Sequence, residues 1–167
     1  MGYTDLEDGI KGLPPKKFPK PIFGNCLPHI DVFLDNGYTK EEQKMIDETK
    51  KILGDDSIKI TATTVRVPVY YGHSESINVE FEKPVTLSGV IETLKEAEGI
   101  VVMDDPKKGI YPTPLDAADT DPVYVGRIRI DDTVENGVNL WVVADNIRKG
   151  AATNAVQIAE RIIAERG

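Results

Sequence analysis

The densest group of polar residues with chemical potential lies between residues 39 and 75. It contains the carboxylate of Glu41, the cations of Lys44 and Arg66, and the imidazole of His73. Within this group, His73 is the one side chain whose ordinary pKa suits proton transfer near neutral pH, so it is the acid/base candidate. A lone histidine is also common as a structural residue, and both interpretations stay open on the sequence alone.

Glu41 and Lys44 are three positions apart in a segment with helical periodicity. On a helix they lie about 60° apart around the axis, so both side chains can reach one ligand. The simpler alternative is that Glu41 and Glu42 complement the positive N-terminal end of the helix while Lys44 is solvated.

Arg66 interrupts an apolar, β-branched run, where a guanidinium on a half-buried strand needs an anionic partner. That partner is either a ligand or a carboxylate of the same chain. Seven steps along an unbroken strand would place Arg66 and His73 on opposite faces. Pro68 and Gly72 allow the chain to turn, so the two side chains can still converge.

Cys26 is the single cysteine of the chain, which excludes an internal disulfide and a cysteine-based zinc site. It lies in an apolar stretch without a basic neighbour that would lower its pKa, so we expect a packing role and not a nucleophile. The two histidines are His29 and His73, and we expect no metal site.

Two regular patterns should position the polar group. Thr39 and Glu42 form a capping box before an apolar periodicity that ends at Gly54, which predicts a helix over residues 40–53. β-Branched residues over 58–69 and alternation over 77–81 predict two strands, the first more buried than the second.

The rest of the chain alternates between strands and helices. Periodicity and turn residues predict a helix over 87–98, strands over 100–103, 123–130 and 138–144, and a helix over 149–165. The loop over 106–121 is either functional or a plain connector. Together these elements predict an α+β fold, with a largely antiparallel or mixed sheet and helices packed on one face.

The 167 residues carry a net charge of −8, with 28 acidic and 20 basic residues. This acidity excludes nucleic acid as an expected partner, and no apolar run predicts a membrane span, so we expect a cytoplasmic protein. Length predicts a single domain over 1–167, with a proline-rich extended arm over 1–21 preceding residues 22–167. No glycine-rich phosphate loop is present.

The chain resembles the C-terminal domain of the aspartate-semialdehyde dehydrogenase family from about residue 22 to its end. The motifs that carry the resemblance are LPHID (27–31), TKEEQKMIDETKKI (39–52), TVRVPVYYGHSE (64–75), YPTP (111–114), VGRIR (125–129) and WVVADNIRKGAATNAVQIAE (141–160). The resemblance implies a fold like the C-terminal domain of glyceraldehyde-3-phosphate dehydrogenase.

The resemblance also implies site roles. Glu41 and Arg66 would bind the amino acid portion of the substrate, with Arg66 on its carboxylate, and Lys44 would meet the phosphate. His73 would be the acid/base for the thiohemiacetal formed by a cysteine, and Asn146 would approach the nicotinamide of NADP. The family reduces L-aspartyl 4-phosphate to L-aspartate 4-semialdehyde, on the route to lysine, threonine and methionine.

The family's NADP-binding Rossmann domain, with its glycine loop and nucleophilic cysteine, has no counterpart in these 167 residues. We therefore expect the chain alone to be inactive and to need that domain as a partner. The resemblance further implies self-association as a homodimer or a tetramer. The alternative function is a stand-alone dimerisation or assembly module without catalysis.

Overall fold

A computed structural model describes residues 17–166 of the protein. The chain divides after Pro68 into two units, and each is described here by itself. Most of the predicted arm over 1–21 lies outside the described residues. The single domain over 1–167 stays a prediction.

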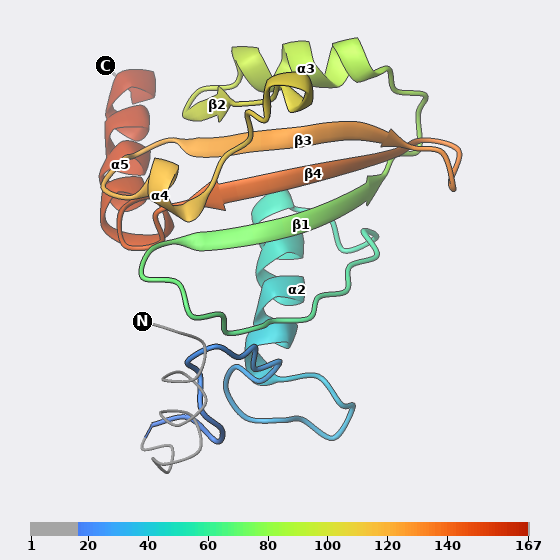
Figure 1. The fold of residues 1–167 in the computed structure, drawn as a ribbon. Helices are drawn as coiled ribbons and strands as arrows, with labels where there is room; N and C mark the ends of the chain where they lie inside the picture. Colours follow the sequence, from blue (N-terminus) through green and yellow to red (C-terminus); the bar gives the residue numbers. More distant parts are fainter. Residues whose placement is uncertain (1–16, 167) are drawn as a thin grey trace. The chain divides into compact units, whose positions relative to one another are not determined.

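In the described part of the first unit, residues 17–68, the helix is α2 (Lys40–Leu53), as predicted (Figure 1). The Thr39 hydroxyl accepts a hydrogen bond from the Glu42 amide, and the Glu42 carboxylate accepts one from the Thr39 amide. At the other end Gly54 takes a left-handed conformation with φ of 67°, which ends the helix. Local sequence chemistry therefore sets both ends of α2.

Residues 58–69 do not form the predicted strand. The side chains alternate between half-buried and exposed from Ile58 to Val65, which is the pattern of an extended chain. However, the segment forms no ladder with any described residue, and its regular pairing is limited to one isolated antiparallel bridge between Leu27 and Arg66. β-Branched residues favour an extended backbone, but they do not supply a neighbouring strand.

The second unit is built on one sheet in the order β1 (His73–Glu80), β4 (Gly137–Ala144), β3 (Val123–Asp131) and β2 (Ile100–Val102) (Figure 1). β4 pairs antiparallel with β1 on one side and with β3 on the other. β2 adds to β3 in parallel. The mixed sheet confirms the α+β prediction.

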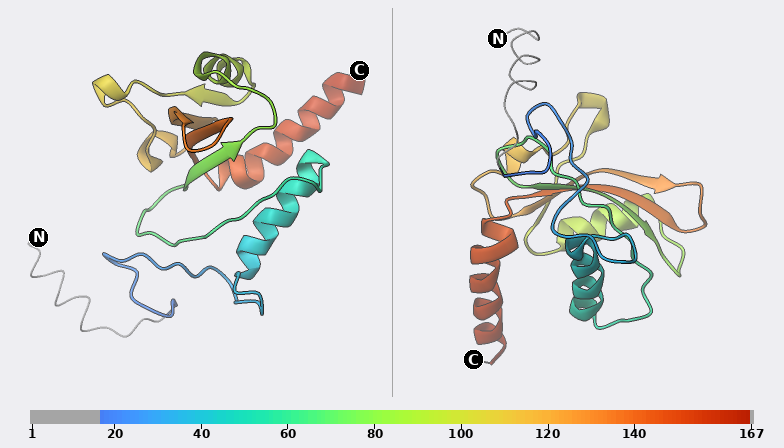
Figure 2. Two further views of the ribbon diagram at one scale, coloured as in Figure 1. Left: turned by 90° about the vertical axis from the view of Figure 1, so that its right-hand side faces the viewer. Right: turned by 90° about the horizontal axis from the view of Figure 1, so that it is seen from below.

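The core of this unit lies between the sheet and α3 (Leu87–Glu96) (Figures 1 and 2). Val125, Ile128 and Val138 are buried at its centre. Around them pack partly buried side chains from α3 and the strands: Val85, Val90, Ile91, Leu94, Ile100, Val102, Val123, Leu140 and Val142. The period of α3 matches this contact face, which explains why the helix was predictable.

The predicted loop over 106–121 contains two short helical turns. These are a 3-10 turn (Pro106–Lys108) and α4 (Pro114–Ala117). Between them, the Pro112 carbonyl accepts a hydrogen bond of 2.9 Å from the indole nitrogen of Trp141 on β4. The segment is therefore fixed to the sheet at Pro112.

The C-terminal segment begins with a π-helical turn (Arg148–Ala152) and continues as α5 (Thr153–Arg166), close to the predicted helix. Several apolar side chains of α5 are exposed, including Val156, Ile158, Ile162 and Ile163. No described helix combines the length and the apolar character that crossing a membrane requires.

Candidate functional site

Glu41 and Lys44 lie together on the first turns of α2. The Lys44 Nζ atom is 3.4 Å from Glu41 Oε1, and the lysine side chain is 53% exposed against 35% for the glutamate. An exposed pair of this kind contributes little to stability. Both charged groups can therefore turn to a ligand at small cost.

Arg66 is exposed, and its backbone pairs with that of one other residue. Its amide and carbonyl both bond to Leu27, each at 2.9 Å. Its guanidinium carbon lies 5.2 Å from the centre of the Phe18 ring, a cation–π contact. Within residues 17–166 no carboxylate forms an ion pair with Arg66, so the salt-bridge alternative has no support there.

The buried carboxylate of the first unit belongs to Glu42, which is 6% exposed. Its Oε2 accepts the Thr39 amide at 2.7 Å, and its Oε1 accepts the Thr64 amide at 2.8 Å. The bonds from the Thr39 and Thr64 amides lower the pKa of Glu42. Sequence analysis found the cap but missed the bond to Thr64, which is 22 positions away.

His73 is the first residue of β1 and is exposed. It pairs in register with Ala144, the last residue of β4, so Asn146 follows two positions beyond its partner. Gly72 precedes it with φ of 69°, and a Cβ there would lie 2.6 Å from the Ala144 carbonyl oxygen. The sheet thus brings His73 and the Asn146 backbone to the same end.

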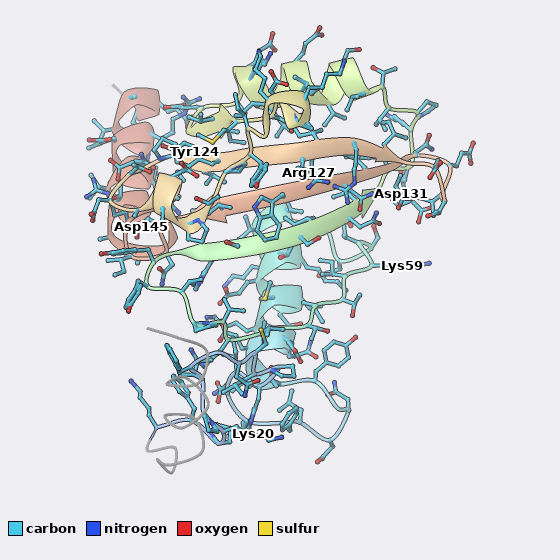
Figure 3. All side chains as sticks on the ribbon, in the orientation of Figure 1. Lys20, Lys59, Tyr124, Arg127, Asp131 and Asp145 are labelled. Atoms are coloured by element: carbon cyan, nitrogen blue, oxygen red, sulfur yellow. The ribbon has the colours of Figure 1, made fainter. Side chains whose placement is uncertain are left out.

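Asp145 fixes the turn that carries Asn146. It is 5% exposed and accepts backbone amides from Asp119 at 3.0 Å, Ile147 at 2.9 Å and Arg148 at 3.2 Å. These bonds, with the Asp119 amide foremost, lower the pKa of Asp145. The residue lies beside α4 at the end of β4 (Figure 3). Sequence analysis did not single it out.

A second contact stabilises the same turn. The guanidinium of Arg148 donates two hydrogen bonds to Asp121, at 2.8 and 3.0 Å. The side-chain amide of Asn146 is half-buried and forms no hydrogen bond with another residue in the part of the chain that the structure describes. It remains available for a ligand that both donates and accepts.

Comparison with known proteins identifies the family of the chain. The family described as "Semialdehyde dehydrogenase, dimerisation domain" matches residues 3–149. This chain belongs to that family. The dimerisation domain is 57% identical over 150 residues to the aspartate-semialdehyde dehydrogenase of Aquifex aeolicus, a match that covers 90% of this chain and 44% of that protein.

Solved structures agree with this assignment. Aspartate semialdehyde dehydrogenase II of Vibrio cholerae, complexed with ASA, has a TM-score of 0.86 and 47% identity, covering 97% of this chain and 48% of that one. The enzyme of Candida albicans with NADP has a TM-score of 0.69 and 30% identity, covering 87% and 46%. The dimerisation domain therefore spans less than half of these relatives.

Cys26 differs from its expected place in the domain. It was predicted to pack in an apolar stretch, but it is exposed. The glycine at position 24 has φ of 64°, and the Asn25 side chain accepts the Cys26 amide at 2.9 Å. This local turn directs the segment outward in spite of its apolar composition. Among the described residues, no cluster of three or more His, Cys, Asp or Glu side chains could hold a metal ion.

Two depressions on the domain do not include the predicted site residues. One of about 320 Å³ lies in the first unit, beside Tyr38 and Thr61. Another of about 450 Å³ lies in the second unit, beside Arg127 and Trp141. The predicted site residues therefore lie outside both depressions. Glu41, Lys44 and Arg66 belong to the first unit, and His73 and Asn146 lie at the end of the sheet in the second unit.

Proposed function

We propose that this chain is the substrate-binding and dimerisation part of an NADP-dependent aspartate-semialdehyde dehydrogenase. The reaction is reduction of L-aspartyl 4-phosphate to L-aspartate 4-semialdehyde with release of phosphate. The observation that carries the proposal is the shared position of His73 and Asn146 at one end of the sheet. An acid/base can serve the oxygen of the reacting carbonyl group, and an amide that meets a nicotinamide can hold the ring beside it, so the two residues together fit a hydride transfer.

The first unit supplies charges for the substrate. In this proposal the guanidinium of Arg66 binds the substrate carboxylate in a bidentate manner, and Glu41 binds its ammonium group. Lys44 leaves its 3.4 Å pair with Glu41 to meet the phosphate. The exposure of Arg66 and Lys44 supports these roles, because neither cation is committed to a buried partner.

The second unit supplies the proton. His73 donates to, or accepts from, the oxygen of the reacting carbonyl group, according to the direction of the reaction. The side-chain amide of Asn146 can meet the nicotinamide of NADP, whose reduced form supplies the hydride when bound. The side-chain amide of Asn146 has no hydrogen-bond partner among residues 17–166, and Asp145 fixes the turn that carries it; both observations fit this assignment. The NADP named for the Candida albicans enzyme supports it.

The nucleophilic cysteine comes from another part of the complete enzyme. Cys26 has no cationic neighbour among its described contacts, so it is a poor candidate. We propose that the 167-residue chain alone is inactive and works in the cytoplasm as part of a homodimer or tetramer, together with an NADP-binding domain. The family description supports the self-association.

A chimeric enzyme tests this proposal. The matching part of the Aquifex aeolicus dehydrogenase is replaced by this chain, which is 57% identical over 150 residues. We expect NADP reduction that depends on both aspartate 4-semialdehyde and phosphate, and we expect loss of that activity in the His73→Asn chimera. A folded, dimeric chimera without activity would contradict the proposal.

A second function, a stand-alone assembly module, is favoured by the dimerisation name of the family. It predicts a folded dimer whose association is unchanged when Glu41, Lys44, Arg66 and His73 are all replaced. It also predicts that no NADP-binding domain restores activity. The chimera distinguishes the two functions, because a module without catalysis cannot supply the proton-transfer group.

A further inference from the structure

The carboxylate of Glu42 is buried and ionisable, yet the proposed reaction gives it no direct role. Its two oxygens bind two backbone amides that belong to separate segments, Thr39 at 2.7 Å and Thr64 at 2.8 Å. The Thr64 hydroxyl adds a longer contact of 3.4 Å to the same oxygen. A carboxylate with these bonds does more than cap a helix, because capping needs only the bond to Thr39.

The segment that receives the second bond has few other supports. Residues 58–65 alternate in burial but form no ladder with a described strand. A hydroxyl contact of 2.8 Å between Tyr38 and Thr61 holds its middle, and the Leu27 bridge holds Arg66. Between these two points, the Glu42–Thr64 bond is the contact that fixes the segment to α2.

The spacing connects Glu42 to the site. Thr64 and Arg66 are two positions apart on an extended chain, so they share one side of it. Glu41 precedes Glu42 directly, and Lys44 follows one half-turn later on α2. One carboxylate thus ties the helix that carries two substrate-binding candidates to the segment that carries the third.

We propose that Glu42 is a positioning residue that holds Arg66 at the distance from Glu41 and Lys44 that the substrate requires. This inference rests on the function proposed above. It follows that Glu42 contributes to recognition of the substrate carboxylate without touching the substrate. This role requires two oxygens that accept hydrogen bonds at the same time. A glutamine has one acceptor oxygen, and its NH₂ group would face the second backbone amide, which is also a donor.

The test uses Glu42→Gln in the active chimera, with Thr39→Val as the matched control. Thr39→Val removes the hydroxyl that caps α2 but keeps the Thr39 amide and the Thr64 bond. We expect Glu42→Gln to raise KM for aspartate 4-semialdehyde about tenfold and to leave kcat within about twofold of the wild type. The tenfold rise in KM corresponds to the loss of one charge-assisted hydrogen bond. Thr39→Val should lower the thermal midpoint yet leave KM within about twofold.

A double-mutant cycle separates positioning from general destabilisation. With Arg66→Lys already in place, Glu42→Gln should raise KM by less than about twofold, because the group that it positions is gone. An equal tenfold rise in the Arg66→Lys background would overturn the proposal. A KM rise in Thr39→Val as large as that in Glu42→Gln would overturn it too.

Failure of the proposed function is recognised separately, as a folded wild-type chimera without activity. In that case backbone ¹⁵N relaxation of the full 167-residue chain still tests the positioning claim. We expect Glu42→Gln to lower the order parameters of Thr64 and Arg66, and Thr39→Val to leave them unchanged. Unchanged order parameters in Glu42→Gln would show that Glu42 does not hold this segment.

Discussion

His73 and Ala144 face each other across the sheet as the first residue of β1 and the last residue of β4. This pairing places the acid/base candidate beside the strand end that leads directly to Asn146. The close approach depends on Gly72, since its Cα lies against the Ala144 carbonyl. The backbone at Gly72 therefore places His73 at the same end of the sheet as Asn146, although the two residues are 73 positions apart in the sequence.

Gly72→Ala should destabilise the chain and disturb His73. A left-handed alanine costs about 1–2 kcal/mol, and the contact of its Cβ with the Ala144 oxygen at 2.6 Å adds about 1–3 kcal/mol. Urea unfolding of the chain measures the loss. In the chimera, kcat should fall as β1 shifts.

Gly109→Ala is the control for that substitution. Gly109 has φ of 68°, nearly the same as Gly72, but a Cβ there meets nothing within 4 Å. Gly109→Ala should lose only the free energy of unfolding that a left-handed alanine costs, and kcat of the chimera should be unchanged. Equal losses of stability in the two variants would show that the Ala144 contact has no energetic weight.

Asp145→Asn should lower the thermal midpoint by several degrees and weaken NADP binding. The variant keeps the size of the side chain but cannot accept the amides of Asp119, Ile147 and Arg148 equally well. Circular dichroism and the KM for NADP in the chimera measure the two effects. Asp132→Asn, at an exposed carboxylate on the same unit, should change neither.

The same carboxylate gives a pH dependence of known sign. Because hydrogen bonds lower the pKa of Asp145 in the folded chain, its contribution is complete above the unfolded value of about 3.9. That contribution disappears as the pH falls through the folded pKa. The stability advantage of the wild type over Asp145→Asn should therefore be constant from pH 7 to 5 and shrink below pH 4. An advantage that is as large at pH 2 as at pH 7 would contradict this assignment.

Lys44→Met should weaken phosphate binding in the chimera. Loss of a charge-assisted contact of about 1.5–3 kcal/mol predicts a rise of at least about tenfold in KM for phosphate. Stability should hardly change, because the pair with Glu41 is exposed. Lys51→Met, on the last turn of the same helix, should leave KM unchanged.

Local patterns predicted the regular elements well and their partners poorly. The capping box of Thr39 and Glu42 predicts α2, and the apolar periodicity of residues 87–98 predicts α3. Both signals are local, because the residues that form them lie within one or two helical turns of one another. Residues 58–69 carry an equally local signal for extended backbone. Pairing is a property of two segments, and composition does not record whether a second segment is beside the first.

The same distinction between local signals and contacts of distant segments applies to the site residues. Glu41 and Lys44 are neighbours through helical spacing alone, and the structure shows them 3.4 Å apart. The bond between Glu42 and Thr64 spans 22 positions and the bond between Asp145 and Asp119 spans 26, so no motif indicated them. His73 was an acid/base candidate from its residue type, whereas the roles of Arg66 and Asn146 came from the family resemblance, and all three roles stay predictions.

The sheet order has a consequence for the sequence of events in folding. β4 meets β3 across a turn of a few residues, but α3, β2 and β3 all lie between β1 and β4 in the chain. The bond between Asn78 and Asn139, for example, joins residues 61 positions apart. Longer loops close later, and β1 is an edge strand with one ladder. We expect hydrogen exchange to be faster in β1 than in β3 and β4. Among β1, β3 and β4, we therefore expect the strand that carries His73 to join the sheet last and to leave it first.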